Sequence, residues 1–194
     1  MRLILASASP RRRQLLEEAG FAIEVDPSGV EEPEPDGPVD AASYVAELAW
    51  RKAHAVASRR GSGLILAADT TCALDGLLLN KPVDRDHAER MLLAQEGREV
   101  AILTGLCLYR ADLLEWAGAV ETSIVHVRRM TDAERLAHLD SGRWEGKAGA
   151  YGVQDDDPFV TVVSGSWSNV VGLPMERLEQ LLRDHPTLSD APRR

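Results

Sequence analysis

The chain has 194 residues, 44% of them hydrophobic, which is enough for one domain with a substantial buried core. Its formal net charge of −9 disfavours nucleic acid or an anionic membrane surface as a partner, because both require a broad basic face. The sequence has no apolar stretch of membrane-spanning length, and its two cysteines form no C-x-x-C motif. We therefore expect a soluble, cytoplasmic protein with two buried, reduced thiols.

The first predicted elements are a strand and a helix joined by a short polar turn. Apolar residues 2–6 predict a buried strand. Ser9 is typical of a helix N-cap and Pro10 of the first helical position, and Gly20 should end the helix.

The polar turn has the residue types of a phosphate site. Ser7 and Ser9 supply hydroxyl groups, and Arg11, Arg12 and Arg13 follow directly. The first N–H groups of a helix have no partners within it, and guanidinium groups bind phosphate oxygens through paired hydrogen bonds. An anion is therefore the expected ligand of this turn.

Further strands and helices alternate along the chain. In chain order, the sequence predicts a strand at 21–25, an acidic, proline-rich loop at 27–40, a helix from Asp40 or Ser43 to about Arg59, a strand and hairpin at 64–79, a helix at 86–94, antiparallel strands at 99–109 and 114–127, a helix at 131–139, a loop at 142–152, a strand at 159–163 and a helix at 174–183. Two long neighbouring strands exclude a purely parallel sheet. The predicted fold class is therefore α/β, with an elongated mixed central sheet flanked by helices. Residues 1–184 should form one domain, and residues 185–194 a disordered tail.

Several charged residues are candidates for a site. Asp69 ends an apolar run, where a carboxylate can meet solvent in a cleft, although it could instead cap the following turn. Lys52 lies on a predicted helix, where most lysines are simply solvated, and Lys81 is held extended by the proline that follows it. Glu32 belongs to an acidic loop that is either solvated or part of a magnesium site completed by phosphate oxygens. The five histidines show no metal-ligand spacing, so we expect all of them at the surface or at an interface.

Five segments, in order, resemble the Maf family of nucleoside triphosphate pyrophosphatases. They are A-S-A-S-P-R-R at 6–12, Y-V-A-E-L-A-W-R-K-A at 44–53, A-D-T-T at 68–71 with K-P at 81–82, K-A-G-A-Y-G-V-Q at 147–154, and S-N-V-V-G-L-P at 168–174. The resemblance covers nearly the whole chain. It implies the two-lobed fold shared with inosine triphosphate pyrophosphatases, with the substrate in a central cleft between the lobes.

The resemblance also implies a reaction and roles for individual residues. A nucleoside triphosphate would be hydrolysed to the monophosphate and pyrophosphate, with Asp69 as the general base that takes a proton from the attacking water. Arg12, Lys52 and Lys81 would clamp the triphosphate. A divalent cation, Mg²⁺ or Mn²⁺, is expected, with Glu32 and Asp69 as its ligands.

Within the family, residues 147–154 resemble the subgroup that acts on dTTP and UTP. Arg11, Thr70 and Gln154 correspond to its specificity positions, and a homodimer is implied. Three alternatives remain open: a nucleotide-binding regulator of cell division without turnover, which has no need for Asp69; a pyrophosphatase of 7-methyl-GTP, whose members differ around 147–154; and a nucleic-acid module, which the acidity disfavours.

Overall fold

The computed structural model describes residues 2–32, 37, 39–152 and 159–189. Its strands are β1 (Arg2–Leu5), β2 (Ala22–Val25), β3 (Leu64–Leu74), β4 (Leu77–Leu79), β5 (Arg98–Arg110), β6 (Glu115–Val127) and β7 (Val160–Ser164). Its helices are α1 (Pro10–Glu18), α2 (Ala41–Arg60), α3 (Arg85–Gln95), α4 (Asp132–Asp140), the single 3-10 turn η1 (Ala148–Ala150), α5 (Trp167–Val171), α6 (Met175–Asp184) and α7 (Pro186–Ser189). None of these helices is both long enough and apolar enough to cross a membrane.

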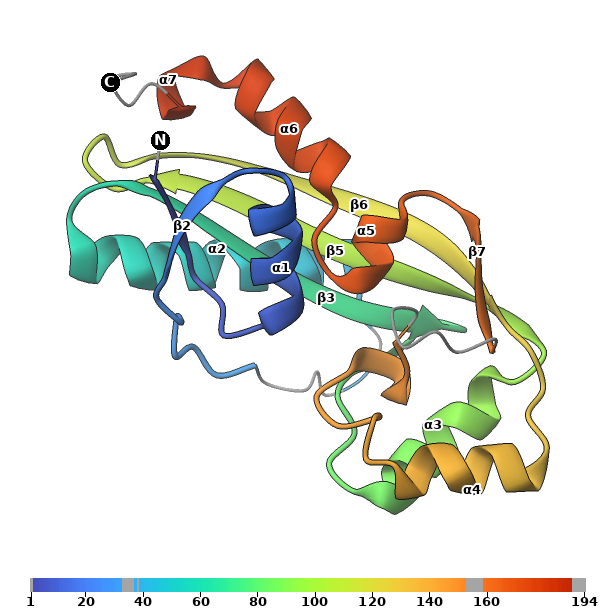
Figure 1. The fold of residues 1–194 in the computed structure, drawn as a ribbon. Helices are drawn as coiled ribbons and strands as arrows, with labels where there is room; N and C mark the ends of the chain where they lie inside the picture. The colour runs from blue at the N-terminus through green and yellow to red at the C-terminus, as the bar shows by residue number, and fades with distance from the viewer. Residues whose placement is uncertain (1, 33–36, 38, 153–158, 190–194) are drawn as a thin grey trace.

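The strands form one seven-stranded mixed sheet, which confirms the predicted fold class (Figure 1). The order is β2-β1-β3-β5-β6-β7, with β4 paired to β3. β1 runs parallel to β2 and β3, and every other pairing is antiparallel. β3 is buried along nearly its whole length because helices cover both of its faces, whereas β6 alternates between buried and exposed residues.

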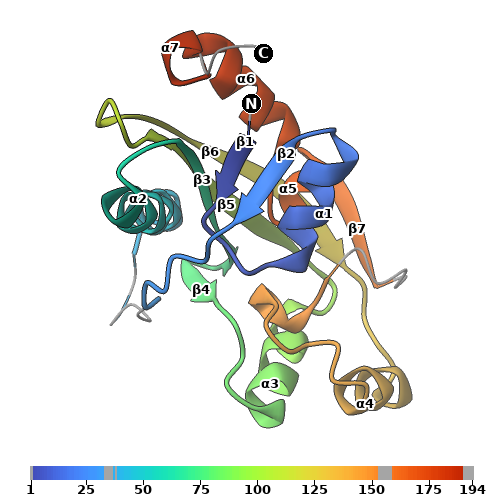
Figure 2. The ribbon, with the colours of Figure 1, turned by 60° about the vertical axis from the view of Figure 1, so that its left-hand side comes forward.

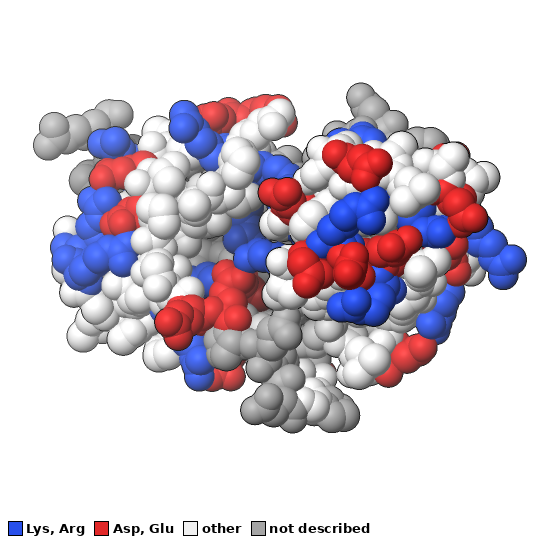
Figure 3. Space-filling view, turned by 90° about the horizontal axis from the view of Figure 1, so that it is seen from below, with Lys and Arg blue, Asp and Glu red and all other residues white. Residues whose placement is uncertain are grey.

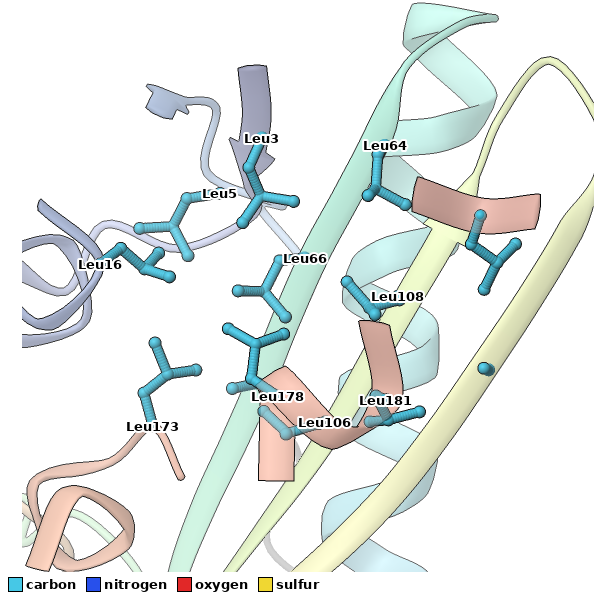
Figure 4. Close-up of a cluster of buried hydrophobic side chains, with 13 residues drawn as sticks. Leu3, Leu5, Leu16, Leu64, Leu66, Leu106, Leu108, Leu173, Leu178 and Leu181 are labelled. Carbon is cyan, nitrogen blue, oxygen red and sulfur yellow. The ribbon is translucent and has the colours of Figure 1, made fainter. Parts of the chain in front are cut away.

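Helices cover the two faces of the sheet unequally. α2 alone packs on one face, and α1, α5, α6 and α7 lie on the other (Figure 2). A leucine-rich cluster fills the second face (Figure 4). α2 approaches β5 closely at Gly105, where an added Cβ would lie 2.3 Å from the carbonyl oxygen of Val45. Only glycine permits this backbone contact.

A smaller part of the molecule, made by α3, α4 and η1, lies beyond one end of the sheet (Figures 1 and 2). It has its own apolar cluster, which includes Met91 and Leu92 of α3 and Leu139 of α4. We call this part the small lobe and the rest of the structure the sheet lobe.

The predicted helix starts are confirmed by their caps. Ser9 accepts a hydrogen bond from the backbone of Arg12, Asp40 accepts one from Ser43, and Thr131 begins a capping box. These motifs were readable from the sequence because each cap acts within four residues.

The structure differs from the sequence predictions at several places, of which the position of Asp69 is described with the site. α5 was not predicted, because it has only five residues, between Ser166 and Gly172. A disordered tail from residue 185 is wrong for residues 185–189, since α7 forms there and Leu188 is buried against the leucine cluster; residues 190–194 lie outside the described residues. His138 was expected at a surface or interface but is buried.

Candidate active site

A cavity of about 630 Å³ lies between the two lobes, a size suited to a nucleotide-sized ligand. It is lined by every predicted site residue that the structure describes: Ser7, Ser9, Arg11, Arg12, Glu32, Lys52, Asp69, Thr70 and Lys81. Gln154, the remaining predicted residue, lies outside the described part of the chain. On the face shown in Figure 3, acidic and basic residues are interspersed, and basic residues also lie in the recess between the two halves.

Two carboxylates and two lysines form a continuous chain of ion pairs in this cavity. Lys52 Nζ lies 2.5 Å from Asp69 Oδ1 and 2.5 Å from Glu32 Oε1, and Lys81 Nζ lies 2.6 Å from Glu32 Oε2. Lys52 and Asp69 are both buried. A buried charge is costly without a partner, and here each of these two side chains is the partner of the other.

Glu32 is strongly biased toward its ionised form. Burial opposes ionisation, but the hydrogen bonds and charges of Lys52 and Lys81 outweigh it and lower the pKa of Glu32 to about 2. The acidic loop is therefore not simply solvated at this position.

Asp69 lies in the middle of β3 and not at its end. The strand continues to Leu74 because residues 70–74 pair with β4 and β5. Asp69 pairs across the sheet with Gly105, the residue that lets α2 lie close to β5. This close approach brings Lys52, on the inner face of α2, within reach of the carboxylate.

Arg12 is bound mainly to the protein. Its Nε donates to Gly172 O at 2.8 Å, Nη1 to Ala68 O at 2.8 Å and Ser7 Oγ at 3.2 Å, and Nη2 to Thr70 Oγ1 at 3.1 Å. Burial lowers the pKa of its guanidinium. Since a guanidinium has five N–H donors, these four bonds leave little of it for a ligand. Arg12 therefore fastens three segments that are distant in the sequence.

The polar contacts continue from Thr70 into the sheet lobe. Thr70 Oγ1 lies 2.9 Å from Thr104 Oγ1, and Thr104 Oγ1 donates to Asn169 O at 3.4 Å. Thr104 and Gly172 belong to this network, although neither was predicted as a site residue. Neither residue belongs to a local pattern that indicates these contacts, which depend on strand pairing and on the position of α5.

The small lobe provides the opposite wall of the cavity. Lys147, Ala148, Tyr151 and Gly152 line it, and Lys147 is largely buried. Apolar side chains also line the cavity, namely Ile102, Val125, Val127 and Val160 of the sheet and Val170 of α5. The cavity thus has a charged side and a largely apolar side.

Glu32 and Asp69 are the carboxylates that could hold a divalent cation. Both contact the same ammonium nitrogen, so their oxygens point toward one small volume. Among the described residues, no group of three or more acidic, histidine or cysteine side chains has the arrangement of a metal site. Two carboxylates suit Mg²⁺ when phosphate oxygens and water complete the coordination, so the donor set fits a cation that arrives with a polyphosphate.

Comparison with solved structures supports the class of fold. The Staphylococcus aureus Ham1 protein aligns with a TM-score of 0.55 over 95% of this chain and 100% of that chain, at 12% sequence identity. The α/β fold with its mixed sheet is therefore shared with that protein.

Sequence comparison then gives the family. The Maf family, described as Maf-like protein, matches residues 2–185, and this chain belongs to it. Among its relatives, a dTTP/UTP pyrophosphatase of Rhodopirellula baltica is 46% identical, covering 94% of this chain and 81% of the relative. A dTTP/UTP pyrophosphatase of Salinibacter ruber is 44% identical, covering 93% and 89%.

Proposed function

We propose that this protein hydrolyses nucleoside triphosphates to the monophosphate and pyrophosphate, with dTTP and UTP as its preferred substrates. The relatives named dTTP/UTP pyrophosphatase support the substrate class. The observation that carries the reaction is the buried Asp69 carboxylate, which lies beside Lys52 in a cavity that Arg11 and Lys81 also line.

In this reaction Asp69 is the general base. It takes a proton from a water molecule, whose oxygen forms a bond to the α-phosphorus while the bond to the bridging oxygen breaks and pyrophosphate leaves. Lys52 binds Oδ1 of Asp69 and so fixes the orientation of the carboxylate. A general base must lie in a fixed position beside the proton that it abstracts, and this contact holds the carboxylate at the cavity.

The remaining cations offset the charge of the triphosphate. Lys81 is half-exposed and Arg11 lies in the first turn of α1, and both line the cavity, so both can reach phosphate oxygens. The first turn of α1 adds backbone donors. Arg12 contributes its charge from behind this wall while it holds Ser7 in place.

We also assign a divalent cation, Mg²⁺ or Mn²⁺, to the carboxylates of Glu32 and Asp69. When bound, it would neutralise charge on the phosphates and polarise them toward attack. A cation at this position would compete with Lys52 for the same carboxylate oxygens. When no substrate is present, the Lys52 ammonium would supply the positive charge that compensates the two carboxylates.

Two further parts of the proposal rest on the family resemblance. Gln154 would read the edge of the pyrimidine base, and the protein would act as a cytoplasmic homodimer. Gln154→Ala should reduce the preference among nucleotides, and sedimentation equilibrium would measure the association state.

The experiment that tests the reaction is pyrophosphate release from a panel of nucleoside triphosphates, with Mg²⁺, with Mn²⁺ and with EDTA. Asp69→Asn should lower turnover by at least about 100-fold, because a general base contributes on that scale. Asp75→Asn, in the exposed hairpin after β3, is the matched control and should retain activity. Full turnover in Asp69→Asn would exclude the proposed mechanism, and nucleotide binding without turnover in the wild type would favour the regulator.

A further inference from the structure

The turn that carries Lys147 and Tyr151 has an unusual backbone. Gly149 and Ala150 both have positive φ angles, +67° and +62°. Glycine adopts this conformation readily, but alanine does not. Ala150 is also completely buried. Such a backbone persists only where the surrounding structure enforces it, and it is found most often at functional sites.

Gln95, at the end of α3, holds the first of these two residues. Its Nε2 donates to Gly149 O at 2.8 Å and to Met91 O at 2.9 Å, so both amide hydrogens are used. Its Oε1 accepts from Cys72 Sγ at 3.5 Å. Gln95 is 4% exposed, and its neighbours on the inner face of α3 are apolar. An amide buried in such surroundings is stable only when it is hydrogen-bonded, so its partners determine its position.

His138 of α4 holds the second residue. Its Nε2 lies 3.0 Å from Ala150 O, and a carbonyl oxygen only accepts, so Nε2 carries the hydrogen. The imidazole ring stacks on the ring of Tyr151, with centroids 5.0 Å apart and planes inclined by 22°. His138 is 1% exposed. Two buried side chains from two helices therefore fix consecutive carbonyl groups of one turn.

This turn lines the same cavity as the proposed phosphate-binding cations. Lys147 and Tyr151 line the cavity from the small lobe, whereas Lys52, Lys81 and Arg11 line it from the sheet lobe and its loops. The backbone N–H of Gly149 donates to Asn80 O at 3.3 Å, so the turn is tied to the chain directly before Lys81. A triphosphate bound to those cations would therefore have its nucleoside inside a cavity that the turn helps to line. Gln95 also lines the cavity at this wall.

We propose that Gln95 and His138 are positioning residues for nucleoside recognition. They hold the 147–151 turn in its positive-φ conformation, which presents Lys147 and Tyr151 to the base and sugar of the substrate. The inference rests on the proposed function, because it takes a nucleotide as the ligand of the cavity.

The test compares binding of two probes by isothermal titration calorimetry with Mg²⁺. One probe is the α,β-methylene analogue of dTTP, which is not hydrolysed, and the other is inorganic tripolyphosphate, which lacks a nucleoside. Gln95→Met keeps an unbranched side chain of similar length but removes both donors. His138→Phe keeps the ring and removes the donor, and His138→Gln keeps a donor at the position of Nε2. Gln180→Met, on the exposed face of α6, is the matched control.

We expect the Kd of the dTTP analogue to rise about tenfold in Gln95→Met and in His138→Phe, the scale of one lost hydrogen bond to the turn. The Kd of tripolyphosphate should not change, and His138→Gln should retain most of the affinity for the analogue. Amide hydrogen exchange within residues 147–151 should become faster in the two weakened variants, because the turn is no longer held.

The inference is overturned if both variants bind the analogue as the wild type does, or if both probes weaken equally. The second result would indicate a general role in stability. If Gln95→Met does not fold, the pair His138→Phe and His138→Gln decides alone. The two proposals can fail separately. If the wild type releases no pyrophosphate, the proposed reaction is refuted. If Gln95→Met then still binds the analogue more weakly than the wild type does, this inference is supported.

Discussion

The two walls of the cavity are built in different ways. One wall, which we call the phosphate wall after its proposed ligand, contains Asp69 of β3, Lys52 of α2, Glu32, Lys81 and Arg12. Its charged side chains pair with one another, and Arg12 joins the surrounding segments through four hydrogen bonds. The other wall, which we call the nucleoside wall after its proposed ligand, is the 147–151 turn. Two buried polar side chains of the small lobe, Gln95 and His138, hold this turn. Ligand binding at the phosphate wall should depend on which charged side chains are present. Ligand binding at the nucleoside wall should depend on the hydrogen bonds that hold one turn. We therefore expect substitutions in the first wall to affect the reaction and those in the second to affect discrimination between nucleotides.

Among substitutions in the phosphate wall, Arg12→Ala should lower stability the most, because it breaks connections among three segments as well as removing charge. We expect turnover to fall at least about tenfold and the free energy of unfolding to fall by about 2 to 4 kcal/mol. A pyrophosphate assay and urea unfolding would measure the two effects. The expected loss of stability follows from the four hydrogen bonds that Arg12 donates to the protein.

The neighbouring Arg13→Ala is the matched control for this prediction. Arg13 is exposed and pairs only with Glu17 among the described contacts, one helical turn away. Its removal should change stability by less than about 0.5 kcal/mol and leave turnover intact. An Arg12→Ala variant as stable as Arg13→Ala would show that Arg12 does not fasten the wall and is available to phosphate.

Lys81→Ala should lower turnover while changing the free energy of unfolding only slightly. The lysine is 54% exposed and contacts Glu32, so its loss removes a phosphate ligand without opening the core. We expect at least about a tenfold fall in turnover, the scale of one charge-assisted hydrogen bond, and a change in unfolding free energy below about 1 kcal/mol. Arg98→Ala, which removes an exposed ion pair with Asp75, should leave turnover unchanged. Unaltered kinetics in Lys81→Ala would remove this residue from the phosphate wall.

The smallest expected effect is the pH dependence of the stability that Glu32 contributes. Its pKa in the folded protein is about 2, below the ordinary value of 4.5, so folding favours the ionised form. Its contribution to stability is therefore fully present above about pH 4.5 and is lost as the pH falls from there toward 2. Because a third of the side chain is exposed, we expect a contribution of roughly 1 kcal/mol.

Denaturant unfolding of the wild type and of Glu32→Gln between pH 6 and about pH 2 would measure this contribution. The stability difference between the two proteins should shrink as the pH is lowered. A difference that stays constant over this range would mean that the ion pairs of Glu32 do not stabilise the fold. Asp40→Asn, which changes an exposed helix cap, gives the response of a carboxylate outside the cavity.

Elements that depend on near neighbours and on residue type could be predicted from the sequence. The caps at Ser9, Asp40 and Thr131, the long antiparallel strands and the residue types of the phosphate wall were all readable, because caps act over three or four residues and strand patterns over a few more. The motifs at Arg12, Lys52 and Asp69 also indicated which residues would line one cavity, although not which of them contact one another.

Which of these residues contact one another depends on how distant segments pack together. The Lys52 ammonium lies between two carboxylates because α2 meets β5 at Gly105, and Arg12 is bound to the protein because α5 brings Gly172 to it. Gln95 and His138 looked like ordinary helix residues, since their partners in the 147–151 turn are many residues away. Hydrogen-bond partners and burial depend on such distant contacts, which a pattern of near neighbours does not contain.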